Sequence, residues 1–189
     1  MVMDLPELHA RSLDAARPAI AGVAADQWSR DSVCDGWDVR TLVNHVVSGN
    51  LWVPELVAGK TIEEVGDRLD GDMLGDDAVA AYDASADLAA AAFKADGAME
   101  RPVAVSYGPV PGEVYCGHRF IDVLIHGWDV AESTGQDTNL PLDLVEACWE
   151  VVEPQLADLG GSGAYGTHVD APADADLQTR LLAALGRRG

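Results

Sequence analysis

The fold is decided by the stretch YCGHRFIDVLIHGWDVAEST (Tyr115–Thr134), whose pattern is that of one uninterrupted helix. At about 100° per residue, its apolar side chains cover most of the helix circumference. The polar residues form one narrow stripe: Arg119, Asp122, His126, Asp129 and Ser133. A helix this apolar is expected to be buried on several sides, so the stretch predicts a helix packed against several others. Gly127 is expected to allow one of those helices to approach closely.

The polar stripe has two interpretations. If it faces solvent, Asp122 and His126 form an ordinary i,i+4 pair, which stabilises a helix by about 0.2–0.5 kcal/mol. If it faces the interior, a buried carboxylate is costly unless a bound cation offsets the cost. Helical bundles build metal sites in this way, with a further ligand from a facing helix. His118 lies about 12 Å before His126 along the helix axis, too far to share an ion with it.

A second stretch, CDGWDVRTLVNH (Cys34–His45), repeats the tetrapeptide Gly-Trp-Asp-Val that follows His126. Here Asp38 stands at a helix N-cap, and Trp37 is expected to help fix the helix start. His45 falls at the edge of the apolar stripe of the following helix, where it is either a hydrogen-bonded core histidine or a metal ligand. The repeat is therefore not a duplication, because one copy begins a helix and the other lies inside one.

Helical periodicity dominates the rest of the chain, and the connections are short. A capping box is expected at 61–64, a short strand or hairpin at 103–107, and an extended segment at 167–172. The predicted helices cover about 5–25, 38–58, 77–95, 113–134, 142–159 and 175–185. The pattern predicts a single all-α domain, 1–189, built as an antiparallel four-helix bundle with an extra C-terminal helix.

Composition excludes several classes of partner. A formal net charge of −20 disfavours binding to nucleic acid and to anionic membranes. The longest apolar run, 88–93, is far below the roughly 20 residues that span a bilayer, and we expect no signal peptide. Three widely spaced cysteines without a Cys-x-x-Cys pair indicate reduced thiols in a cytoplasmic protein.

These motifs, together with the ending DLQTRLLAALGRRG (176–189), resemble the actinobacterial DinB-like proteins related to the metal-binding N-terminal domain of mycothiol-dependent maleylpyruvate isomerase. The resemblance covers nearly the whole chain. It implies a DinB-like up-down four-helix bundle and one divalent metal ion, with zinc expected and nickel or iron as alternatives. The implied ligands are His45, Asp122 and His126. The isomerase has glutamate where this chain has Asp122, and its second, C-terminal domain is not expected here.

The implied ligand set indicates what chemistry the site could support. Two imidazoles and one carboxylate leave at least one coordination position open, as in catalytic zinc sites. A divalent ion lowers the pKa of a bound water or thiol, and the thiolate is the effective nucleophile in thiol chemistry. The resemblance therefore implies an enzyme, a transferase or isomerase, that adds mycothiol or another low-molecular-weight thiol to a small electrophile. The alternatives are a non-catalytic metal- or ligand-binding bundle and a non-haem iron enzyme.

Further residues are candidates for contacts around this site. Arg119 either holds an anionic group of the substrate or forms an ion pair with Asp122 or Asp129. Trp52 and Asp129 either line the substrate pocket or support the ligands, or they have ordinary roles in the core and on the helix surface. The sequence leaves open whether Cys34 or Cys116 approaches the metal, which electrophile is used, and whether the protein is a monomer or a homodimer.

Overall fold

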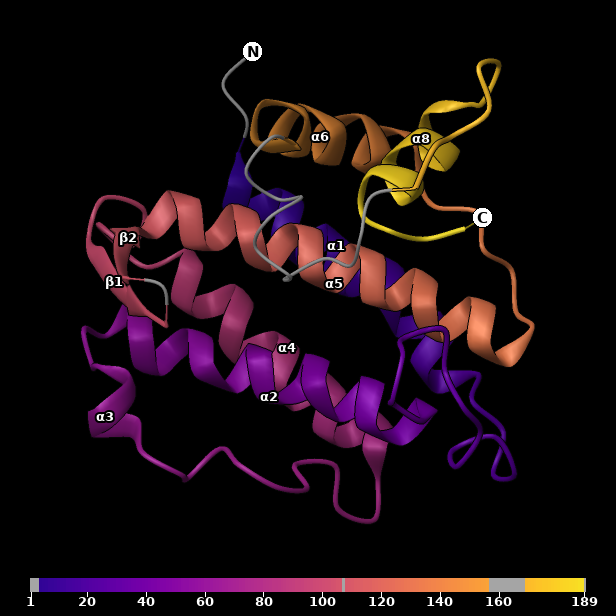
Figure 1. Cartoon of the computed structure of the whole chain (residues 1–189). Helices are drawn as coiled ribbons and strands as arrows, with labels where there is room; N and C mark the ends of the chain where they lie inside the picture. The colour runs from indigo at the N-terminus through magenta and orange to yellow at the C-terminus, as the bar shows by residue number, and fades with distance from the viewer. Residues whose placement is uncertain (1–3, 107, 157–168, 189) are drawn as a thin grey trace. The chain divides into compact units, whose positions relative to one another are not determined.

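The computed structural model describes residues 4–106, 108–156 and 169–188, and over these residues it is mostly helical with one small sheet (Figure 1). The chain divides into two compact units, Met1–Thr138 and Asn139–Gly189. Among the described helices, none is both long and apolar enough to cross a membrane.

The first unit is built from α1 (Leu5–Ala21), α2 (Val39–Val57), α4 (Ala78–Phe93) and α5 (Gly112–Thr134). Helix α5 packs against α1 and α2, and α4 also packs against both of these helices. Figure 1 shows α1 and α5 side by side. The core between the helices includes Leu13, Ile20, Leu42, Val46, Tyr82, Val123 and Val130. Each helix thus buries an apolar face, as the periodicity predicts.

The close approach expected at Gly127 is confirmed. A Cβ atom placed on Gly127 would lie 2.7 Å from the Cβ of Ala16, so any side chain there would collide with α1. The absence of a side chain therefore lets α1 and α5 pack closely around the centre of the stretch that begins at Tyr115.

The helix starts follow the predicted capping residues. Asp38 caps α2 by accepting a hydrogen bond from the backbone N–H of Thr41. Thr61 and Glu64 form the expected capping box at the start of the short helix α3 (Ile62–Val65). Helix α1 ends at Ala21 rather than near residue 25, and its cap is Gly22. The chain then turns, because the side chain of Gln27 accepts a hydrogen bond from the N–H of Ala24.

The predicted strand or hairpin is a hairpin of β1 (Pro102–Val105) and β2 (Gly108–Pro111), paired antiparallel with Val103 opposite Val110. It leads directly into α5. At the first residue of α5, Gly112, a Cβ would lie 1.8 Å from the carbonyl oxygen of Ala98, so only glycine fits this junction.

The second unit contains α6 (Leu142–Val152), the 3-10 helix η1 (Glu153–Gln155) and α8 (Leu177–Ala184), with α6 packed against α8. The helix predicted over 142–159 changes to 3-10 geometry at Glu153, just before Pro154, and residues 157–159 lie outside the described residues. Of the predicted extended segment, 167–168 also lie outside them. Helix α8 begins at Leu177 because the side chain of Asp176 caps it.

Candidate metal centre

The polar stripe of α5 faces the interior of the first unit. Arg119 donates hydrogen bonds from Nη2 to the side-chain oxygen of Asn50, at 3.1 Å, and to the carbonyl of Val46, at 3.5 Å, both on α2. Helix α2 also carries His45, whose Nε2 lies 3.4 Å from Oδ1 of Asp122. The interior-facing interpretation of the stripe is therefore the one that the structure adopts.

His45, Asp122 and His126 meet at one point. Oδ1 of Asp122 lies 3.4 Å from Nε2 of His45 and 3.6 Å from Nε2 of His126, and one potential ligand atom from each residue lies within 4.8 Å of the others. Two ligands at about 2 Å from one ion, at tetrahedral angles, lie roughly 3.3 Å apart. The three donor atoms thus have separations that a single divalent ion could bridge with small adjustments.

Arg119 forms an ion pair with Asp122, at 2.8 Å between Nη1 and Oδ2. This ion pair was one of the two roles that the sequence suggested for Arg119. The guanidinium lies against the backbone of α2 at Gly49, where a Cβ would be 2.3 Å from Nη1. Only 9% of the Arg119 side chain is exposed, and the side-chain oxygen of Asn50 accepts a further hydrogen bond from it. The periodicity gave no reason to single out Gly49 or Asn50, because their roles depend on how α2 and α5 pack.

The charges of the site shift the pKa values of its groups. Burial alone would raise the pKa of Asp122, but the guanidinium of Arg119, followed by His126 and His45, lowers it well below its ordinary value. Burial alone would lower the pKa of His126, but the charge of Asp122 and the hydrogen bond to Asp129 raise it to about 10. Without a metal ion, the cluster is therefore a carboxylate held between an imidazolium and a guanidinium.

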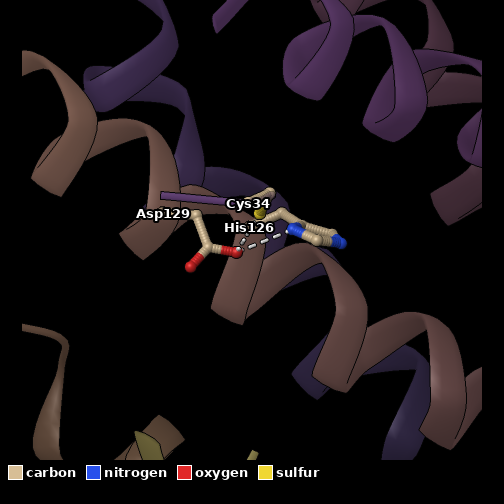
Figure 2. Close-up of side chains that lie close together, drawn as sticks. All are labelled: Cys34, His126 and Asp129. Atoms are coloured by element: carbon tan, nitrogen blue, oxygen red, sulfur yellow. Dashed lines mark hydrogen bonds and ion pairs between the residues drawn. The ribbon is translucent and has the colours of Figure 1, made fainter. Parts of the chain in front are cut away.

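Asp129 holds the other side of the His126 ring (Figure 2). Its Oδ2 lies 2.8 Å from Nδ1 of His126 and accepts a hydrogen bond from Sγ of Cys34 at 3.4 Å. Asp129 is fully buried, whereas Cys34 is partly exposed. Nε2 of His126 is thereby left on the side of Asp122 and His45, which is the orientation that a metal ligand needs. The sequence left open whether Cys34 or Cys116 approaches the metal site. Cys34 lies beside it, in contact with Asp129, whereas Cys116 lies in a separate apolar cluster.

Trp37 also lies at the site, which the sequence did not indicate. Its ring centroid is 4.9 Å from that of His45 and 6.1 Å from that of His126. The sequence assigned Trp37 only to the helix start, and no periodic signal was available because the residue precedes α2.

The candidate Trp52 and two further histidines lie elsewhere in the first unit. Trp52 packs against the apolar cluster that contains Val53 and Phe93. His9 is fully buried with its ring nearly perpendicular to that of Phe93, and neither of its ring nitrogens has a hydrogen-bond partner in the described structure. His118 is partly buried on α5.

The fold is similar to that of mycothiol-dependent maleylpyruvate isomerase. A crystal structure of a mutant of that enzyme matches with a TM-score of 0.63, covering 91% of this chain and 77% of that chain. The two sequences are 17% identical, so this likeness concerns the fold alone.

Comparison of the sequence, in contrast to that of the fold, identifies the family of the chain. Residues 9–131 match the model of the mycothiol maleylpyruvate isomerase N-terminal domain, and the chain belongs to this family. It is also 35% identical over 189 residues to uncharacterized proteins from two strains of Mycobacterium tuberculosis, covering 98% of both chains. The matched region contains all three predicted metal ligands, Cys34 and Asp129.

Proposed function

We propose that this protein is a divalent-metal-binding, thiol-dependent transferase or isomerase that uses mycothiol or a similar low-molecular-weight thiol on a small electrophile. The observation that carries the proposal is the meeting of His45, Asp122 and His126 donor atoms within 4.8 Å of one another. Membership of the mycothiol maleylpyruvate isomerase N-terminal domain family supports the thiol as cosubstrate.

The donor set fits the proposed ion. Two imidazole nitrogens and one carboxylate oxygen suit zinc, and nickel or iron are the alternatives. Asp122 is one methylene shorter than glutamate, yet its Oδ1 already lies between the two histidines at 3.4 and 3.6 Å. The His45 side chain is 38% exposed, so thiol and electrophile could approach from its side.

The surrounding residues prepare this donor set. Arg119 holds Oδ2 of Asp122, which leaves Oδ1 directed at the two histidines. Asp129 holds Nδ1 of His126, so that Nε2 remains available. A divalent ion held by these residues would lower the pKa of a thiol, making the thiolate available as nucleophile at neutral pH. Substrate contacts by Arg119, Trp52 and Asp129 stay predictions, and in this arrangement Arg119 and Asp129 act mainly by positioning the ligands.

Several broader assignments belong to the same proposal. The packing of α1, α2, α4 and α5 supports a DinB-like up-down four-helix bundle. One domain over 1–189, a cytoplasmic location and a monomer or homodimer stay predictions. The alternative function is a non-catalytic metal- or ligand-binding protein.

The test compares metal content and thiol consumption in the wild type, His126→Ala and His118→Ala. His118 provides the matched control, since it lies two turns earlier on the same helix. With mycothiol and a chlorinated aromatic as electrophile, the wild type and His118→Ala should bind zinc and consume thiol, and His126→Ala should do neither. Zinc binding without thiol consumption would favour the non-catalytic alternative, and equal zinc content in all three proteins would refute the site.

A further inference from the structure

We propose that Cys34, His126 and Asp129 form a second divalent-metal site, which shares the imidazole ring of His126 with the first. The two sites would use opposite nitrogens of that ring: Nε2 with His45 and Asp122, and Nδ1 with Cys34 and Asp129. This second site goes beyond the proposed function, because it requires neither His45 nor a thiol cosubstrate.

The donor atoms of the second set are already close together (Figure 2). One potential ligand atom from each of Cys34, His126 and Asp129 lies within 4.8 Å of the others. Sγ of Cys34 lies 3.4 Å from Oδ2 of Asp129, close to the spacing of two ligands on one ion. Nδ1 of His126 lies 2.8 Å from the same oxygen, so these two atoms would separate by roughly half an ångström on binding.

The segment that carries Cys34 is fixed in place. Its ends are joined by a bridge between Asp31 and Asp38, and the N–H of Cys34 donates to Oγ of Ser32. The N–H of Val33 donates to Oγ of Ser133 at 3.0 Å, which ties the segment to α5 beside Asp129. The thiol is therefore held near His126 by backbone contacts, and its position does not depend on the thiol's own hydrogen bond.

The chemistry of the second set differs from that of the first. It contains a sulfur donor, which favours ions such as zinc and cobalt over magnesium and calcium. Cys34 is partly exposed, so an ion has access from solvent, while Asp129 is fully buried. With Cys34 as a thiolate, the second set holds two negative side chains, Cys34 and Asp129, whose charge matches that of one divalent cation. Binding would displace two protons, from the thiol of Cys34 and from Nδ1 of His126.

The experiment titrates metal-free protein with Co²⁺ and counts bound ions by equilibrium dialysis, while following the near-ultraviolet charge-transfer band that a thiolate–Co²⁺ bond produces. The wild type should bind two ions and show the band. Cys34→Ala should bind one ion and lack the band. The matched control is Cys116→Ala, which removes a buried thiol of the same unit and should keep both ions and the band. Circular dichroism and thermal unfolding show whether each variant folds.

His45→Ala separates the two proposals. It should lose the first ion and keep one ion together with the band. A wild type that binds a single ion, a band that survives Cys34→Ala, or a band that disappears in His45→Ala would each overturn the second site. If His45→Ala keeps two ions, the first site fails instead, whatever the fate of the band.

Discussion

The buried histidine of α1 makes the stability of this protein depend on pH in a way that can be measured. His9 has no exposed surface, and burial lowers its pKa from the ordinary 6.5 to about 3, with Arg119 adding to the effect. Between these two pH values the unfolded chain binds a proton at this position and the folded protein does not. Stability therefore falls as the pH drops below 6.5, by up to about 1.4 kcal/mol per pH unit.

The perturbation is His9→Phe, which keeps a ring at this position and removes the titrating group. From pH 7.5 to pH 5.0, the contribution of His9 should cost the wild type about 2 kcal/mol, because 5.0 lies 1.5 units below the unfolded pKa of 6.5. His126, whose folded pKa is raised to about 10, changes stability by the same amount in the variant and in the wild type over this window. The difference between variant and wild type then isolates His9.

Urea unfolding at pH 7.5 and pH 5.0 measures this difference directly. On going from pH 7.5 to pH 5.0, the free energy of unfolding of His9→Phe should rise by about 2 kcal/mol relative to that of the wild type. Ser12→Ala is the control, because it alters a buried, non-titrating residue on the same helix and should shift stability equally at both pH values. A His9→Phe difference that is the same at both pH values would refute the reasoning, since His9 would then have an ordinary pKa in the folded protein.

Further outcomes are expected at the site and in the core. Arg119→Leu should lower the free energy of unfolding by about 3–5 kcal/mol in urea titrations, because it leaves the carboxylate of Asp122 buried without its closest cation. Gly127→Ala should cost about 1–3 kcal/mol in the same assay, because its Cβ would lie 2.7 Å from a side chain of α1; an unchanged midpoint would contradict the packing described. Asp129→Asn should weaken zinc binding at the His45 site about 10–100-fold in a chelator competition, because Nδ1 of His126 loses its carboxylate partner. In metal-free protein, the contribution of His126 is fully present below pH 6.5 and is lost as the pH rises toward about 10, so thermal unfolding should move to lower temperature over this range and should do so less in His126→Gln.

Local signals in the sequence were sufficient for most of the helical elements. Apolar periodicity predicted each long helix of the first unit, and the capping residues Asp38 and Thr61 marked two starts that the structure confirms. The end of α1 was missed by several residues, because Gly22 and the hydrogen bond from Ala24 to Gln27 stop the helix where the apolar pattern continues.

The sequence by itself determined which residue types could form the site: Asp122 and His126 are four residues apart on one helix, and so share a face whatever packs against them. Only the tertiary structure decided that this face looks inward and that His45, 77 positions from Asp122 in the chain, reaches the same point. It also decided the places of Trp37 and Cys34, which precede α2 and follow no helical period. The physical reason is that periodicity describes one helix at a time, whereas a three-donor site depends on the rotation and separation of two helices, which side chains far apart in the sequence determine together.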